Sequence, residues 1–113
     1  MRAMIAWWEL AESAQTIESL RGFLRDEAVA AWSDQPGLVL KLWIADEEND
    51  RWGAVLVWES AEAAAPPHPR SAAELIGYPP THRTWFDIEA TVEGRHALSS
   101  LVGLGRALEV PGR

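Results

Sequence analysis

Two apolar runs separated by a short polar cluster form the clearest pattern in the chain. The first run covers residues 36–45 and the second covers residues 51–59; both are rich in Val, Leu and Trp, and the polar residues 46–50 lie between them. Such a pattern predicts two strands joined by a turn. Asn49 and Asp50 tolerate a left-handed backbone, so we expect the turn at these residues. Because an isolated hairpin is marginally stable, other elements must pair with it and cover it.

The residues before the hairpin predict a strand and then a helix. Residues 3–9 are apolar and aromatic and are followed by a polar break, which favours a strand. From Ser13 the apolar residues recur every three or four positions, as they do along one face of a helix. We expect Ser13 to be the N-cap, and the sequence Asp-Gln-Pro-Gly at 34–37 to end the helix.

The residues after the hairpin predict a short, interrupted helical segment and a last strand. Residues 59–65 favour about one helical turn, which three prolines between positions 66 and 69 then break. The sequence Ser-Ala-Ala-Glu at 71–74 matches a capping box, and Gly77 is placed to end a short helix. The aromatic and β-branched content of residues 82–92 predicts the final strand.

The order of these elements is β-α-β-β-α-β, which predicts an α+β ferredoxin-like fold with helices on one face of an antiparallel sheet. We expect a single domain over residues 1–113, with its core at 3–92. A weak helical tail is expected at 95–110, loosened by Gly103 and Gly105.

One face of this sheet needs a cover that a single chain does not provide. Alternation along the second and last strands gives each strand one uniformly apolar face and one mixed face. We expect the uniform faces to point toward the helices and the mixed faces to meet a second copy of the chain in a homodimer. The predicted interface residues are those of the mixed faces: Lys41, Trp43, Trp85 and Asp87. Lys41 is expected to pair with Asp87 or with an acid of the partner chain.

Composition narrows the class of function. A net charge of −7 argues against nucleic-acid binding, and the absence of cysteine excludes disulfides and thiolate chemistry. No apolar run is long enough for a membrane span, and we expect a cytoplasmic protein. His68, His82 and His96 are scattered without metal-ligand spacing, so no metal is expected. Seven tryptophans are more than a small core needs, so some are expected to line a ligand pocket or a subunit interface.

Short motifs around the hairpin resemble a known superfamily. They are Pro36-Gly37 entering a strand, Lys41-Leu42-Trp43 within it, the acidic turn at 46–49, and the strand-to-helix junction at 57–63. With these motifs the chain resembles the dimeric α/β-barrel superfamily, which includes the antibiotic-biosynthesis monooxygenases, and is most similar to the YdhR-type monooxygenases. The resemblance covers most of residues 3–92. It implies a dimeric α/β barrel and a monooxygenase that needs no cofactor and acts on an aromatic or polycyclic phenol.

Haem-degrading relatives give a further comparison. They have a tryptophan at the position of Trp58, a histidine ten residues later, as His68 is here, and an asparagine on the first strand. This chain has no asparagine on residues 3–9, and prolines flank His68. We therefore expect that haem does not bind as a catalytic substrate.

The residues themselves suggest a pocket but leave its use open. His82 and Asp87 lie five apart on one strand, hence on opposite faces, and cannot form an acid–base pair. Tyr78 either packs or donates its hydroxyl to a ligand at a cavity mouth. The alternative to the enzyme is a non-catalytic small-ligand-binding or structural homodimer of the same fold. The pocket candidates lie between sheet and helices: Trp32, Trp58, His68, Tyr78, His82 and Phe86.

Overall fold

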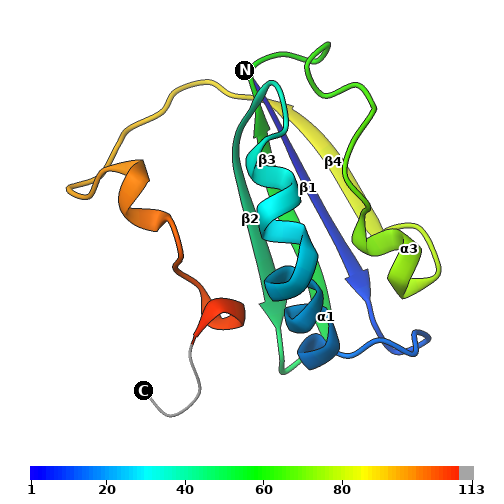
Figure 1. The fold of residues 1–113 in the computed structure, drawn as a ribbon. Helices are drawn as coiled ribbons and strands as arrows, with labels where there is room; N and C mark the ends of the chain where they lie inside the picture. Colours follow the sequence, from blue (N-terminus) through cyan, green and yellow to red (C-terminus); the bar gives the residue numbers. More distant parts are fainter. Residues whose placement is uncertain (110–113) are drawn as a thin grey trace.

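The computed structural model describes residues 1–109, which form a four-stranded antiparallel sheet with strand order β2-β3-β1-β4 (Figure 1). This order and the helices on one face confirm the predicted α+β ferredoxin-like fold. Asp50 has a φ of 55°, so the turn between β2 and β3 lies where the sequence predicts it. The last strand is shorter than predicted and ends at Asp87. The strands are β1 (Arg2–Glu9), β2 (Leu38–Asp46), β3 (Arg51–Trp58) and β4 (His82–Asp87).

The main helical cover is nearly continuous. It consists of α1 (Ile17–Phe23), a π-helical segment η1 (Leu24–Ala28) and α2 (Val29–Ser33). Thr16, rather than the predicted Ser13, is the N-cap: its hydroxyl accepts a hydrogen bond from the Ser19 backbone N–H at 3.0 Å, and the Ser19 hydroxyl accepts one from the Thr16 N–H at 2.9 Å. The Ser13 hydroxyl instead donates to the Ile76 carbonyl at 2.9 Å and so joins this cover to the second one.

The second helical cover is short, as the sequence predicts. The helix α3 (Ala72–Ile76) is capped by Gly77, whose φ of 101° is left-handed. Ser71 is its N-cap without a side-chain hydrogen bond, so the predicted capping box does not form. Residues 59–71 contain only turns and irregular backbone. One side of the sheet is therefore covered by a long helical segment and, beside it, by an open loop and a short helix (Figure 1).

The predicted assignment of the two sheet faces is wrong. Trp43 lies beside Ala54 and Lys41 beside Leu56, and both Ala54 and Leu56 are buried under the helices. Along β4 the same holds for Trp85, whose neighbour on β1 is Met4. The four residues predicted to form the dimer interface therefore occupy the helix side of the sheet: Lys41, Trp43, Trp85 and Asp87. Alternation separates two faces but does not say which of them the helices cover.

Strand order also rules out the predicted pairing of Lys41 with Asp87 within the chain. Their strands, β2 and β4, are opposite edges of the sheet, three strand spacings or about 14 Å apart. Asp87 pairs instead with Arg2 on the neighbouring β1, at 3.3 Å.

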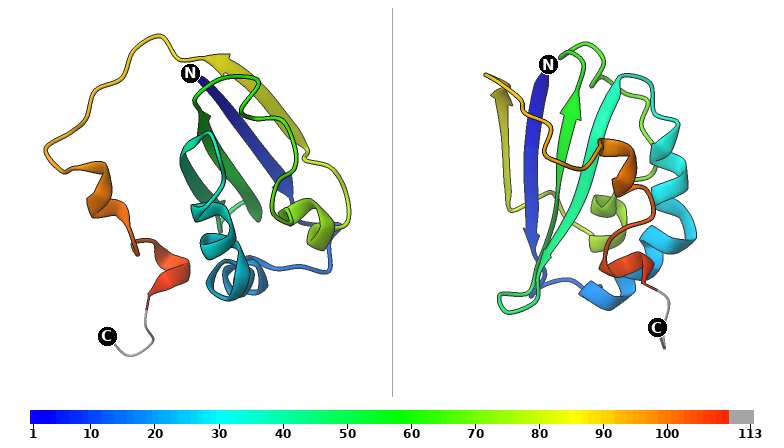
Figure 2. Two further views of the ribbon diagram at one scale, coloured as in Figure 1. Left: turned by 45° about the horizontal axis from the view of Figure 1, so that its top comes forward. Right: turned by 90° about the vertical axis from the view of Figure 1, so that its left-hand side faces the viewer.

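Among residues 1–109, no helix lies on the other face of the sheet. The right-hand view of Figure 2 shows α1 and α3 on the same side of the sheet. Leu42 is 43% exposed, Ile44 42% and Phe86 50%. We call this surface the open face and define it by its apolar residues: Ile5, Trp7, Leu40, Leu42, Ile44, Val55, Val57 and Phe86.

The C-terminal segment runs past the edge of β2 and returns to the helical layer (Figures 1 and 2). It contains two 3₁₀ turns, η2 (Leu98–Leu101) and η3 (Arg106–Leu108), rather than the predicted weak helix. Gly103 and Gly105, with φ of 80° and 122°, interrupt any longer helix. Residue 110, the last of the predicted tail, lies outside the described residues.

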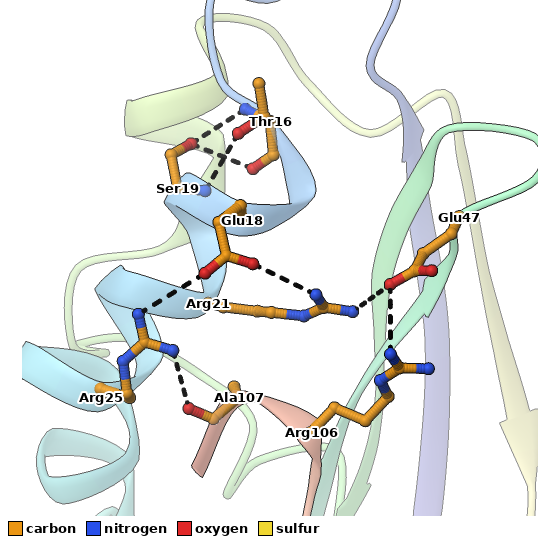
Figure 3. A network of polar contacts seen from close by, with 8 residues as sticks. All are labelled: Thr16, Glu18, Ser19, Arg21, Arg25, Glu47, Arg106 and Ala107. Carbon is orange, nitrogen blue, oxygen red and sulfur yellow. Dashed lines mark hydrogen bonds and ion pairs between the residues drawn. The ribbon is translucent and has the colours of Figure 1, made fainter. Parts of the chain in front are cut away.

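Polar contacts fasten this tail to the domain (Figure 3). Arg25 donates to the Ala107 carbonyl at 3.0 Å. Glu47, just after β2, pairs with both Arg21 of α1 and Arg106 of the tail. The hydrogen bond from Arg21 lowers the pKa of the Glu47 carboxyl below its usual value. Among residues 1–109, no helix is long and apolar enough to cross a membrane.

Candidate functional site

A cavity of about 250 Å³ lies between the sheet and its helical cover. Six of the seven tryptophans line it, and they come from all four strands and from α2. The seventh, Trp7, lies on the open face and stacks on His82, with 4.3 Å between ring centroids. Tryptophans beyond the number that a small core needs therefore line a cavity in this chain. The six are Trp8, Trp32, Trp43, Trp52, Trp58 and Trp85.

Three aromatic side chains form one corner of the cavity. Trp58 ends β3 and is 1% exposed; Trp32 ends α2 and meets it edge-on at 6.3 Å between ring centroids. His68 stacks on Trp58 at 5.3 Å and lies 5.6 Å from Trp32. The structure thus brings together three of the predicted pocket residues, and the ten-residue spacing of Trp58 and His68 corresponds to a direct contact.

The cavity exists because its cover is built from small residues. The wall opposite the sheet includes Ala64 from the turns after β3, then Ser71, Ala72 and Ala73 at the start of α3. None of these side chains is long enough to fill the space above the tryptophans. The predicted break of the second helical segment at the prolines between 66 and 69 is consistent with this arrangement.

The side-chain amine of Lys41 lies in the aromatic wall of the cavity. Its Nζ lies 3.4 Å from the ring centroid of Trp32 and 4.7 Å from that of Trp43. Burial lowers the pKa of Lys41 from 10.5 to about 7. The two ring faces act in the opposite sense, because an aromatic face attracts the ammonium form. The amine and the ammonium are thus both accessible near neutral pH.

The remaining charged groups of the cavity are also cationic. Arg70 is held by Glu27 through two hydrogen bonds of 2.9 and 3.0 Å. Arg83 donates to the sulfur of Met4 at 3.2 Å. Within the part of the chain that the structure describes, no aspartate or glutamate lines the cavity. In a chain with a net charge of −7, this local excess of positive charge favours an anionic or acidic ligand.

Three predicted pocket residues lie elsewhere. The Tyr78 hydroxyl donates to the Glu9 carbonyl and the Tyr78 carbonyl accepts from Trp8 Nε1 at 2.9 Å, so Tyr78 packs between elements. His82 and Phe86 point to the open face, because alternate residues of β4 point to opposite sides of the sheet. Neither lines the cavity.

Sequence reasoning missed several wall residues for a single reason. Trp43, Trp85, Arg83 and Lys41 all belong to the mixed faces of their strands, which were assigned away from the helices. The polar residues among the aromatics on these faces were a usable signal, because a ligand site combines apolar walls with a few polar groups. Within residues 1–109, no group of three or more His, Asp or Glu side chains could hold a metal ion.

Comparison with known proteins supports the fold. No protein-family model matches the chain, and no curated protein matches it. Among solved structures, the chain is similar to a mutant of SnoaB, a cofactor-independent oxygenase from Streptomyces nogalater. The TM-score is 0.53 at 18% sequence identity, over 80% of this chain and 95% of that one. The likeness extends over nearly the whole neighbour, and at this identity it establishes a shared fold.

Proposed function

We propose that the chain is a cofactor-independent monooxygenase that acts on a hydroxylated aromatic or polycyclic small molecule bound in the tryptophan-lined cavity. The observation that carries the proposal is the cavity itself: six tryptophans line an open space, although four of them are also buried members of the core. The fold shared with a cofactor-independent oxygenase and the resemblance to YdhR-type monooxygenases support it.

The cavity suits a flat ligand of modest size. A cavity of about 150 Å³ holds benzene, so about 250 Å³ has room for a second fused ring. The indole faces offer stacking surfaces, and the polar groups at the wall fix the orientation of the ligand.

Such a site can support oxygenation without a bound cofactor. The substrate must then supply the electrons: a ring CH₂ group and O₂ give a carbonyl and water, with no external reductant. An electron-rich substrate anion in a water-poor aromatic cavity is the reactive species such chemistry needs. Cationic side chains in the wall stabilise that anion.

We also propose that the chain works as a homodimer in which a second copy covers the open face. On this face Leu42 and Ile44 of β2 and Phe86 of β4 are exposed at the two edges of the sheet, and the apolar residues of β3 and β1 between them are half-buried. Contiguous apolar surface of this kind marks an interface. This proposal keeps the predicted dimer but moves its interface to the side of the sheet opposite to the predicted one.

Oxygen consumption tests the enzyme proposal. The panel contains naphthols and hydroxyanthrones, which carry or tautomerise to a ring CH₂ group, and hydroxyanthraquinones, which can bind but are already oxidised. Each is added to the protein while dissolved oxygen and tryptophan fluorescence are recorded. We expect quenching by flat hydroxylated aromatics and oxygen uptake with at least one of them. Quenching without oxygen uptake by any member would replace the enzyme by the non-catalytic binding module, and absence of both would reject the cavity as a ligand site.

A further inference from the structure

Lys41 is the only lysine in the chain; the other nine basic residues counted with it are arginines. An arginine stays protonated at any physiological pH, whereas a lysine can lose its proton when it is buried. Of the lysine and arginine side chains, the one able to exchange a proton in this way, Lys41, lies in the wall of the tryptophan-lined cavity.

The surroundings of Lys41 offer it no anion. Its Nζ lies over the rings of Trp32 and Trp43, and it has no ion-pair partner within residues 1–109. The other titratable or charged groups of the cavity wall are His68 from the loop, Arg70 before α3, and Arg83 on β4. Burying a cation without a counterion costs free energy, so the part of the cavity beside the Lys41 Nζ suits a ligand oxyanion.

We infer that Lys41 is the proton acceptor of this cavity: its neutral amine takes the proton from an acidic hydroxyl of the bound aromatic, and the resulting ammonium holds the oxyanion. The inference deepens the proposed function, because it rests on the ligand being a hydroxylated aromatic. It adds a residue that touches the reacting molecule.

This proton transfer balances in atoms and in charge. The O–H bond of the hydroxyl breaks, an N–H bond forms on Nζ, and no electron leaves the ligand in this step. The lowered pKa of Lys41, about 7, supplies the amine near neutrality. The product is an ammonium–oxyanion pair in an aromatic cavity, where charge-assisted hydrogen bonds are stronger than in water.

Proton uptake on binding tests the product of this step, an ammonium at Lys41 beside a ligand oxyanion. The probe is 2-hydroxy-1,4-naphthoquinone, a flat bicyclic compound that is already an anion at neutral pH. Calorimetric titrations are run about one pH unit above the Lys41 pKa, in two buffers of different ionisation enthalpy. The difference between the two measured heats gives the number of protons exchanged. We expect the wild-type chain to take up about one proton for each probe bound, because the amine becomes an ammonium beside the anion.

Three variants test whether Lys41 is the residue that takes up the proton. Lys41→Met removes the amine and should abolish proton uptake and weaken binding at least about tenfold. Lys41→Arg keeps a permanent cation, so it should bind the anion without proton uptake. Arg83→Gln removes a different cation from the same cavity and should weaken binding while proton uptake persists.

The outcomes separate this inference from the proposed function. Binding without proton uptake by the wild type, or undiminished uptake in Lys41→Met, overturns the role of Lys41, as does failure of the wild type to bind the probe. Proton uptake that depends on Lys41 supports the role whether or not any phenol consumes oxygen, and oxygen uptake alone decides the monooxygenase.

Discussion

The two faces of the sheet differ in what interrupts their apolar surface. The helix side alternates tryptophans with Lys41 and Arg83 around a cavity of about 250 Å³. The open face is an unbroken apolar surface in its centre, and its ion pair lies at one end, where Glu9 and Arg51 meet at 2.7 Å. The difference separates two tasks: a face that holds a small ligand needs polar groups among its aromatics, whereas a face that packs against protein does not.

The comparison also explains why the uniformly apolar faces of β2 and β4 were wrongly predicted to lie under the helices. Helices normally cover the more apolar face of a sheet, because that burial stabilises the fold. Here the cover is incomplete, since residues 59–71 form turns rather than a helix, so the covered face is not a solid core. The more apolar face remains exposed in the single chain and forms the better surface for a second copy.

The largest effect is expected from a charge on the open face. Leu42→Asp would bury an unpaired carboxylate in the proposed dimer and should raise its dissociation constant at least about a hundredfold. Sedimentation velocity over a concentration series measures this shift. Trp43→Ala is the matched control, because Trp43 is the next residue of β2 and points to the cavity; it should leave the dimer intact. A monomeric wild-type chain at micromolar concentration would contradict the proposed dimer.

The next effect is expected on the free energy of unfolding. It tests the register between β1 and β3, which decides the face of the sheet on which each residue lies. A Cβ at Gly53 would lie 2.3 Å from the Ala6 carbonyl oxygen and 2.8 Å from the Trp7 Cβ. Gly53→Ala must push β1 and β3 apart and should lower the free energy of unfolding by about 2 kcal/mol or more. Gly22→Ala in α1 is the control. Its new methyl group meets nothing closer than 3.8 Å, and alanine favours the helix, so stability should rise by about 0.5–1 kcal/mol. Equal effects of the two substitutions on urea denaturation would show that the strands are paired in a different register.

Ligand binding should distinguish aromatic residues of the two faces. Trp43→Ala removes a cavity wall and should weaken binding of a flat hydroxylated aromatic about tenfold. Trp58→Ala should weaken it more, because Trp58 contacts both Trp32 and His68 at the closed corner. Fluorescence quenching titrations measure these affinities. Phe86→Ala on the open face is the control and should leave the affinity unchanged; a loss there would move the ligand to the other side of the sheet.

The last effect is a pH dependence of stability. Because the Lys41 pKa is about 7 in the folded chain and 10.5 ordinarily, the unfolded chain binds more protons between these values. Stability of the wild type should therefore rise with pH across this window, by at most about 1.4 kcal/mol per pH unit. Lys41→Met lacks this contribution, so its stability advantage over the wild type should be greatest below pH 7 and shrink toward pH 10.5. Parallel denaturation curves at several pH values measure the difference, and a constant gap would show that Lys41 titrates alike in both states.

Local patterns in the sequence predicted the elements of the fold and part of the site. The hairpin, the strand before the first helix, the short helix ending at Gly77 and the β-α-β-β-α-β order of elements follow from hydrophobic period and turn residues. The prolines between 66 and 69 predicted the gap in the cover, because proline removes a backbone donor wherever it occurs. Trp58 and His68 were singled out by the resemblance to haem-degrading relatives, and the structure places their rings in contact.

What only the tertiary structure decided is which side of each strand meets the helices, and so which residues form the cavity. The side-chain period of a strand is two, so the sequence separates Leu42 from Trp43 but treats both sides of the sheet alike. The symmetry is broken by the crossover of the helices onto one side, and that depends on the chain as a whole. The position of Lys41 among the tryptophans follows from this choice, as do the places of His82 and Phe86 on the opposite face.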